Sequence, residues 1–276
     1  MKTKSTSSSG SLGESLQTVF AAVVIPVEIG IAVLIYLFVL GNPDNFTGGD
    51  PVNGHPVDGN IFGTVYQGGI IVPILLSLLM LVVTFAIERF LTITIAKGKT
   101  STQSFIKKIK SLIEAGNITQ ALAECDRQKG SVANVVKAGL TKFSELQNDK
   151  SIDIEKKVQI IQKDIEETTQ LEMPMLQKNL VIIATIASIA TLVGLLGTVL
   201  GMIKSFSAMA TAGAPDSVKL ASGISEALIN TALGIGTSAF AILFYNFFTS
   251  KIDALTYGID EAGFTIIQNF TTQTKD

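Results

Sequence analysis

Four long apolar stretches set the strongest limit on what this chain can fold into. They are Val19–Leu40, Gly68–Ile87, Leu180–Ile203 and Ala227–Ser250. About 20 apolar residues are needed to cross the hydrocarbon core of a bilayer, and each stretch meets that length. Only the first contains a charged residue, Glu28. The sequence therefore predicts an all-α integral membrane protein with four transmembrane helices.

The composition agrees with a membrane protein and excludes several other classes. Hydrophobic residues make up 47% of the chain and charged residues only 16%, a poor balance for a soluble domain. The net charge of -2, with no basic patch, argues against a nucleic-acid partner. A single cysteine, Cys125, and a single histidine, His55, exclude an intramolecular disulfide and the common zinc sites. No phosphate loop or nucleophile motif is present, so we expect no enzyme, cofactor or metal.

The distribution of basic residues predicts the orientation. Residues 41–67 contain no lysine or arginine, whereas residues 97–178 hold 14 of the 21 in the chain. Lysine and arginine accumulate on the cytoplasmic side of membrane proteins. We therefore expect residues 41–67 outside, and both termini and residues 97–178 in the cytoplasm. We expect the first stretch to stay as a helix, because it is longer than the apolar part of a usual signal peptide.

The spans divide the chain into nine expected segments. These are a cytoplasmic leader at 1–18, a transmembrane helix at 19–40, a periplasmic loop at 41–67, a second transmembrane helix at 68–96, a cytoplasmic helical domain at 97–178, a third transmembrane helix at 179–206, a periplasmic turn at 207–216, a fourth transmembrane helix at 217–250 and a cytoplasmic C-terminal helix at 251–276.

Apolar periodicity predicts the helices of the cytoplasmic region. It favours helices over 102–115 and 131–146, and a short one through Cys125 with Asn117 as its N-cap. A longer helix from Ile154 is expected to run into the third span, with any bend at Pro174. An apolar stripe predicts that the fourth helix also projects into the cytoplasm. Its members are Ile252, Leu255, Ile259, Ala262, Ile266 and Phe270.

The third and fourth spans are rich in small and hydroxyl residues, which is typical of helices that pack against protein or line water. A polar stripe on the third comprises Ser188, Thr191, Thr198 and Ser205, beside the glycines Gly194, Gly197 and Gly201. A matching stripe on the fourth comprises Thr231, Ser238 and Tyr245, with Gly234 between. We expect both helices to line a pore.

Counting from the connection between these spans predicts which residues share a depth. With a turn at 211–215 and Asp216 as the cap, Thr198 and Thr231 lie level. Glu226 is then about 7 Å from Thr231 along the helix, inside the bilayer, where an ionisable group indicates function. Alternatively, the hydroxyls only join helices and Glu226 lies at the interface. Glu28 fits an interfacial or packing role better than an ion path.

At these same residues the sequence resembles the MotA/TolQ/ExbB proton-channel family. TLVGLLGTVLGMIKSF at 191–206 is similar to the family's signature ascending helix, and GISEALINTALG at 223–234 to its descending helix. Tyr245 and Asn246 also fit the family pattern, and AGNITQALAECDRQKGSVANVVKAGL from Ala115 resembles its cytoplasmic helices. These segments are more similar in sequence to ExbB and TolQ than to MotA.

The resemblance implies a pentameric ring around the transmembrane helices of a dimeric ExbD/TolR-like partner, each carrying a proton-binding aspartate. It implies that Thr198 and Thr231 solvate that aspartate, since a hydroxyl can both donate and accept, while Glu226 polarises the water-filled path. The ring would sit in the bacterial inner membrane, among its lipids, and convert the proton-motive force into mechanical work. A TonB-like protein that energises transport is the client the resemblance favours.

The sequence also departs from the family. Many members have proline where this chain has Thr191 and Phe240, and the first span is additional to the three-helix plan of ExbB and TolQ. A TolQ-like envelope motor, a MotA-like motility stator and a non-conducting scaffold remain alternatives, and protons are not separated from sodium ions. A secondary transporter is less favoured, because the two pairs of spans show no internal repeat.

Overall fold

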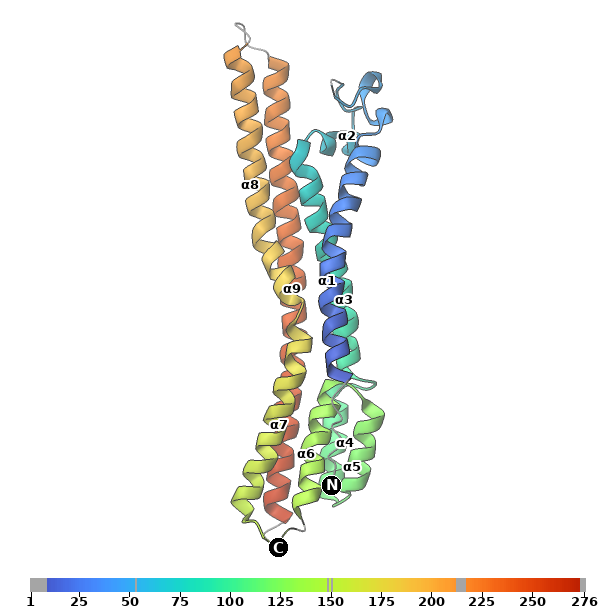
Figure 1. Cartoon of the computed structure of the whole chain (residues 1–276), viewed down its shortest axis with the longest axis vertical. Helices are drawn as coiled ribbons and strands as arrows, with labels where there is room; N and C mark the ends of the chain where they lie inside the picture. The colour runs from blue at the N-terminus through green and yellow to red at the C-terminus, as the bar shows by residue number, and fades with distance from the viewer. Residues whose placement is uncertain (1–8, 53, 148, 150, 212–216, 274–276) are drawn as a thin grey trace. The chain divides into compact units, whose positions relative to one another are not determined.

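The computed structural model describes residues 9–52, 54–147, 149, 151–211 and 217–273 of the chain (Figure 1). Four helical stretches are long and apolar enough to cross a membrane: Phe20–Leu40, Gly69–Glu114, Ile154–Ser207 and Ser217–Thr272. Each overlaps one of the four predicted spans, and the last three are much longer than predicted. The chain is therefore all-α in its described secondary structure, apart from one isolated β-bridge between Phe46 and Pro56. Residues 212–216, with the predicted turn and the Asp216 cap, lie outside the described residues.

The chain divides into two compact units, each considered by itself. The first unit comprises Met1–Ala86 and Val181–Tyr245, and the second comprises Ile87–Leu180 and Asn246–Asp276. Helix α3 (Val72–Lys97) and helix α9 (Ser217–Gln273) each contribute to both units. The first unit also contains α1 (Ser9–Leu34), α2 (Ile61–Tyr66) and nearly all of α8 (Leu180–Thr211).

The segment that follows α1 in the first unit is folded rather than extended. A π-helical turn, Ile35–Leu40, is followed by short 3-10 turns at Pro43–Asn45 and Thr47–Gly49, and another, Gly69–Ile71, precedes α3. The side-chain amide of Asn45 donates to the backbone oxygens of Val39 and Leu40, at 2.8 and 3.0 Å. The rings of Tyr36 and Tyr66 stack with centroids 4.6 Å apart. These contacts give residues 41–67 a defined shape.

The second unit is a bundle of α4 (Thr102–Glu114), α5 (Ile118–Gln128), α6 (Ser131–Gln147), α7 (Ile154–Gln177) and the C-terminal part of α9. The helices expected in this part of the sequence are confirmed. Every member of the predicted apolar stripe of α9 is at least 95% buried, as expected for one face of a helix in a core. The ring of Phe143 meets that of Phe270 edge to face, with centroids 4.9 Å apart.

One detail of the predicted helices is confirmed only in part, and another is wrong. Asn117 occupies the N-cap position of α5 as predicted, but its side chain makes no capping hydrogen bond. The helix from Ile154 also does not run unbroken into the third span: α7 ends at Gln177, two turn residues follow, and α8 begins at Leu180. Pro174 lies inside α7, so the interruption falls beyond the proline rather than at it.

A buried arginine stabilises this interruption within the second unit. Arg89 is fully buried, and its Nη1 donates to the backbone oxygens of Met175 and Leu176, at 3.1 and 3.0 Å. Such carbonyls at the end of a helix lack intrahelical donors and need other partners. The neighbouring carboxylate of Glu88 accepts from Arg89 Nε at 2.6 Å and from Asn179 Nδ2 at 3.1 Å. The guanidinium charge and the free helix end are thus both satisfied.

Candidate functional site

Two threonine hydroxyls meet where α8 and α9 face each other in the first unit. Thr198 Oγ1 and Thr231 Oγ1 are in direct hydrogen-bond contact, and either can be the donor. Each can also donate to its own helix, Thr198 to Gly194 O at 3.2 Å and Thr231 to Ala227 O at 3.1 Å. Because a hydroxyl has one proton and two lone pairs, this pair can exchange donor and acceptor roles. The two residues predicted to share a depth do lie together.

An ion pair joins the same two helices. Lys204 Nζ donates to Glu226 Oε2 at 2.7 Å. The Glu226 side chain is 12% exposed and that of Lys204 is 65% exposed, so the carboxylate is covered while the ammonium group reaches the surface of the unit. A charge-assisted bond of this kind stabilises an ionised carboxylate that would otherwise be costly to bury.

A glycine turn covers the other side of the Glu226 carboxylate. Asn230 Nδ2 donates to the backbone oxygen of Gly68 at 2.8 Å, which fixes this turn against α9. Gly69 has a φ of +72°, and a Cβ there would lie 2.5 Å from Glu226 Oε1. Only glycine combines that backbone conformation with such close approach. The turn that leads into α3 therefore encloses the Glu226 carboxylate together with α8 and α9.

Small residues bring α8 and α9 close enough for these contacts. A Cβ on Gly194 would lie 2.9 Å from Asn230 O, and one on Gly201 would lie 2.8 Å from Gly223 O. On α9, a Cβ on Gly234 would lie 2.6 Å from Ala190 O. Gly197 faces the side chain of Asn230 in the same way. Helices in membranes commonly gain packing and hydrogen bonding from such close backbone approach.

The other residues of the two predicted polar stripes fall into separate groups. Ser205 donates to Leu220 O at 3.2 Å, and Ser238 donates to Ala187 O on the facing helix. Ser188 and Thr191 are exposed on the surface of the single chain, and Tyr245 is half-buried. The structure thus places Ser205 and Ser238 in helix contact and leaves Ser188 and Thr191 available to other molecules.

Three parts of the site were not predicted from the sequence as such: Lys204 as the partner of Glu226, Asn230, and the turn at Gly68 and Gly69. Lys204 could have been found by the same depth count, since it lies as far beyond Thr198 as Glu226 lies before Thr231, within one residue. The Gly68 and Gly69 contacts join residues more than 150 positions apart in the chain, and no local pattern announces them.

Glu28 occupies a separate contact, between α1 and α3. It is 7% exposed, and its Oε1 accepts a hydrogen bond from Thr84 Oγ1. Among the described residues no partner reaches its Oε2. The expected packing role agrees with this position, and the carboxyl is not part of the group around Glu226 in α8 and α9.

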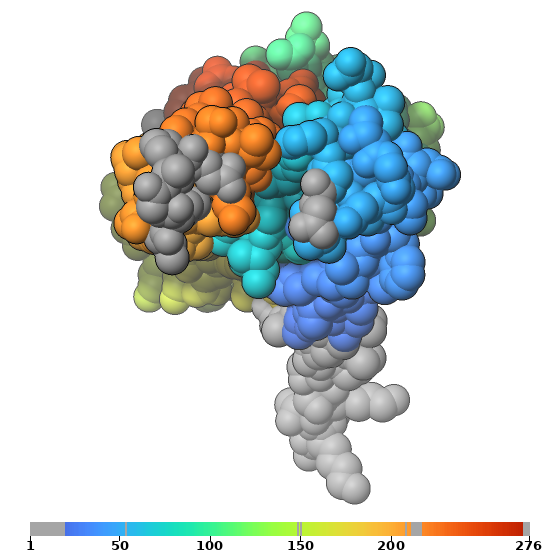
Figure 2. Space-filling view, turned by 90° about the horizontal axis from the view of Figure 1, so that it is seen from above, coloured from blue at the N-terminus to red at the C-terminus, as the bar shows by residue number. Residues whose placement is uncertain are grey.

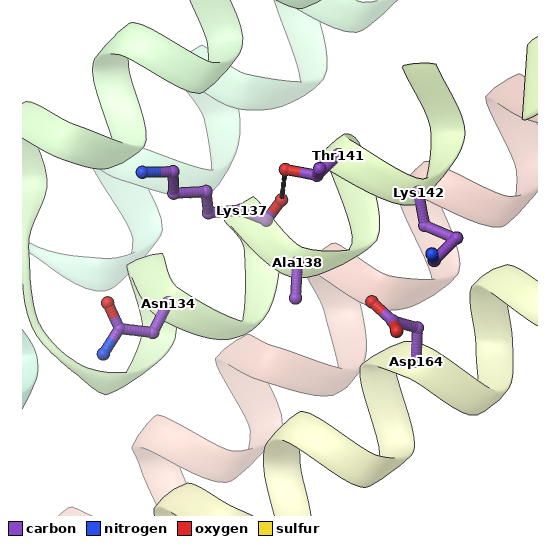
Figure 3. Close-up of a pocket in the computed structure, with 6 residues that line it drawn as sticks. All are labelled: Asn134, Lys137, Ala138, Thr141, Lys142 and Asp164. Carbon is purple, nitrogen blue, oxygen red and sulfur yellow. Dashed lines mark hydrogen bonds between the residues drawn. The ribbon is translucent and has the colours of Figure 1, made fainter. Parts of the chain in front are cut away.

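A shallow pocket with polar lining residues lies on the second unit. Asn134, Lys137, Ala138, Thr141 and Lys142 of α6 and Asp164 of α7 line it (Figure 3). Its polar groups bond mainly to the protein itself: Thr141 donates to Lys137 O, and Lys142 pairs with Glu145 at 2.8 Å. The hydrogen bond to Glu145 raises the pKa of the partly exposed Lys142. In the described part of the chain, no group of three or more potential metal ligands is present.

A comparison with known protein families finds a match that covers the region of this site. The sequence model of the MotA/TolQ/ExbB proton channel family matches residues 127–261, which include α8 and both threonines. Over these residues, which are just under half of the chain, the sequence matches that family. The four long apolar helices and this match support a multi-pass membrane protein.

Individual relatives are named as Tol-Pal system and biopolymer transport proteins. The Tol-Pal system protein TolQ of Pseudomonas aeruginosa is 31% identical over 49% of this chain and 61% of its own length. The biopolymer transport protein ExbB of Helicobacter pylori is 42% identical over 29% and 56%, respectively. A putative ExbB homolog of Methanothermobacter thermautotrophicus is 26% identical over 70% and 66%. The match to this chain thus covers between 56% and 66% of the length of these relatives.

Proposed function

We propose that this protein is the ring-forming channel subunit of an inner-membrane motor that converts the proton-motive force into mechanical work. The single observation that carries the proposal is the hydroxyl contact between Thr198 and Thr231, with the Glu226–Lys204 ion pair on the same two helices. Proton-accepting and proton-donating groups on facing helices are what a proton path through a membrane requires. The match to a proton-channel family supports this use of them.

The threonine pair would serve a carboxyl group in either protonation state. A hydroxyl donates to a carboxylate and accepts from a carboxylic acid, so Thr198 and Thr231 can solvate an incoming acidic side chain before and after it takes a proton. Lys204 and the Gly69 turn keep the Glu226 carboxylate in place beside this path. One charge that crosses a potential of 100 mV supplies about 2.3 kcal/mol, so a work cycle needs several crossings.

The proposed assembly is a homopentamer whose α8 and α9 surround the helices of a dimeric ExbD/TolR-like partner that carries the acidic side chain. Ser188 and Thr191 are exposed on the single chain, as residues that face a partner or a lumen must be. A ring of five around a dimer cannot satisfy all its sites at once, so each protonation event would turn one component against the other. Both termini and the second unit would lie in the cytoplasm, and residues 41–67 in the periplasm.

The deciding experiment replaces Thr231 by valine and Glu226 by alanine and measures client-dependent growth, such as uptake of a scarce iron complex. Valine keeps the shape of threonine and removes only the hydroxyl. The matched control is Thr185→Val on α8, because that exposed hydroxyl donates only to Val181 O of its own helix. We expect growth to be lost with Thr231→Val and Glu226→Ala and kept with Thr185→Val, with membrane assembly intact in all three.

Full growth of the Thr231→Val and Glu226→Ala cells would contradict the ion path and favour a non-conducting scaffold. That alternative has its own support in Ser205 and Ser238, whose hydroxyls join the two helices. The client is proposed to be a TonB-like protein that energises transport, in keeping with the relatives named for biopolymer transport. If the role is instead TolQ-like envelope maintenance, which the Pseudomonas relative supports, the variants should lose envelope integrity. If it is MotA-like motility, they should lose swimming.

A further inference from the structure

Glu28 is a buried carboxyl that the proposed ion path does not use. It lies on α1, within the first of the four apolar stretches, and is 7% exposed. Its Oε1 accepts a hydrogen bond from Thr84 Oγ1 on α3. Its Oε2 is fully buried, and among the described residues no hydrogen-bond partner reaches it. Buried polar atoms nearly always have a partner, so an unpartnered oxygen at this place needs a physical reason.

One narrow face attaches α1 to the rest of the first unit. Among residues 20–34 the side chains that are not exposed recur at helical spacing, and they are Ala21, Val24, Ile25, Glu28 and Ala32. Phe20, beside them, meets Phe85 of α3 edge to face, with ring centroids 6.3 Å apart. Figure 2 looks down on the first unit and shows the blue residues of α1 at its margin, apart from the orange end of α8 and α9. The face that holds α1 therefore has a carboxyl near its middle.

The lysines of the first unit lie away from this carboxyl. In the described part of the unit the basic side chains are Lys204 and Lys219. Lys204 is bonded to Glu226, next to the turn that leads into α3, and Lys219 lies further toward the start of α9. Thr84 is twelve residues inside α3, which is about 18 Å along the helix axis. The lysines are therefore found toward one end of α3, whereas the carboxyl contacts the middle of this helix.

The nearest charges along α3 neutralise each other. Glu88 and Arg89 follow Thr84 by about one turn, and Arg89 Nε donates to Glu88 Oε2 at 2.6 Å. The next titratable side chain after Glu28 is Tyr36, whose hydroxyl donates to a backbone oxygen. Glu28 takes part in none of the ion pairs among the described residues. The carboxyl thus has no counter-ion in the part of the chain that the structure describes.

Without a counter-ion, the neutral acid is the form of this carboxyl that the site can hold. An unpaired carboxylate in apolar surroundings costs far more free energy than an unsatisfied neutral oxygen. The hydroxyl of Thr84 fits the acid, because it donates to Oε1 as the carbonyl oxygen and leaves Oε2 to hold the proton. A carboxylate in the same place would have one hydrogen bond where it could accept several. An ionisable residue inside an apolar span is by default a candidate functional site.

We propose that Glu28 is a second proton-binding site of this protein, and that its proton keeps α1 packed against α3. Loss of the proton would leave an uncompensated charge in the middle of the contact, and α1 would have to move away until water reaches the carboxylate. The first apolar helix would thus be attached only while Glu28 is protonated. The site is separate from Thr198 and Thr231, so it does not depend on the proposed ion path.

Infrared spectroscopy of the whole chain in lipid bilayers detects this proton directly. A protonated carboxyl has a C=O stretching band that is separate from the bands of carboxylates. At pH 7.5 we expect one such band in the native protein and its loss in Glu28→Gln. Thr84→Val should keep the band and move it to higher wavenumber, because it removes the hydrogen bond to Oε1 and preserves the shape of the side chain. Glu226→Gln is the matched control and should leave the band unchanged, since the Glu226 carboxylate is ion-paired.

Spin labels test whether the proton holds the helix. With Cys125 replaced by alanine, Val27→Cys on α1 and Val83→Cys on α3 place two labels at positions that are 52% and 47% exposed. Pulsed electron paramagnetic resonance measures the distance between the labels, in samples diluted with unlabelled chains. We expect one short distance at pH 7 and a second, longer one at higher pH, whose population relative to the first grows by up to about tenfold per pH unit. With Glu28→Gln the short distance should persist, since glutamine cannot ionise.

The two measurements decide separate points. A native protein without the carboxyl band at pH 7.5, or a band that survives in Glu28→Gln, would overturn the proton-binding site. Distances that stay the same at every pH up to 10 would overturn the proton-dependent attachment of α1. In either case the growth phenotype of Thr231→Val would stand. Should Glu28→Gln fail to accumulate, Thr84→Val decides the assignment, and a band that it does not move would count against Glu28.

Discussion

The α8–α9 contact of the first unit and the bundle of the second unit are both helical, but they are packed by different means. The first relies on glycine at Gly194, Gly201 and Gly234 and on side-chain hydroxyls. The second relies on large aliphatic and aromatic side chains such as Phe143 and Phe270, which are fully buried. Water drives apolar side chains together, whereas lipid tails give helices no such drive, so close approach and hydrogen bonds must hold them. The difference agrees with the prediction that the α8–α9 contact lies in the membrane and the second unit lies in water.

Removal of a large core side chain from the second unit should have the largest effect. Phe270→Ala is expected to lower the free energy of unfolding of the folded protein by about 3–5 kcal/mol, because it leaves a cavity beside Phe143. Phe264→Ala on the same helix is the matched control, since Phe264 is 68% exposed. Denaturant unfolding in detergent measures both. Equal losses of stability from the two changes would show that burial in the core does not explain the effect of Phe270→Ala.

A single methyl group in the α8–α9 contact should cost somewhat less. Gly234→Ala puts a Cβ 2.6 Å from Ala190 O and 2.8 Å from Gly194 Cα, both backbone atoms that cannot turn aside. Overpacking of this kind costs about 1–3 kcal/mol. Gly236→Ala, two residues further along, has nothing within 4 Å of its Cβ and should not destabilise the protein. Resistance to unfolding by dodecyl sulfate in mixed micelles compares them. Similar losses for both would mean that the close approach at Gly234 does not cause the effect, because alanine has the higher helix propensity at either position.

Loss of one interhelical hydroxyl should have a small effect. Ser238→Ala removes the bond from Ser238 to Ala187 O and is expected to cost about 0.6 kcal/mol, the typical value for such bonds between membrane helices. Ser188→Ala, at an exposed position of α8, should change nothing measurable in the single chain. Resistance to unfolding by dodecyl sulfate in mixed micelles again measures the difference between the two variants. A loss of several kcal/mol for Ser238→Ala would make hydrogen bonding, rather than glycine packing, the main support of this contact.

Because it is buried in the core of the second unit, the Cys125 thiol should react very slowly with alkylating reagents. Burial raises the pKa of the Cys125 thiol to about 12, from an ordinary value of 9.0. The neutral thiol is therefore favoured in the folded protein, and this contribution to stability is lost only as the pH rises through the interval between those values. We expect no alkylation of the folded protein by iodoacetamide at pH 8 and rapid alkylation after unfolding, measured by mass spectrometry. Rapid labelling of the native protein would show that this bundle opens readily.

Periodic patterns in the sequence predicted more of the fold than of the site. The apolar stripe from Ile252 to Phe270 predicted the buried face of α9 because a helix repeats every 3.6 residues. The depth count brought Thr198 and Thr231 together because two antiparallel helices share one connection. The predicted unbroken helix from Ile154 failed, since the break before Leu180 depends on Arg89, which lies far away in the sequence.

The sequence by itself determined that four stretches are long and apolar enough to cross a membrane, which helix faces are apolar and which two helices carry the hydroxyl groups. Those properties depend on composition and on spacing along one helix. Only the tertiary structure decided that Lys204 pairs with Glu226 and that the Gly69 turn covers the same carboxylate. These contacts join distant segments, and their energy depends on distances of a few ångströms that no local pattern encodes.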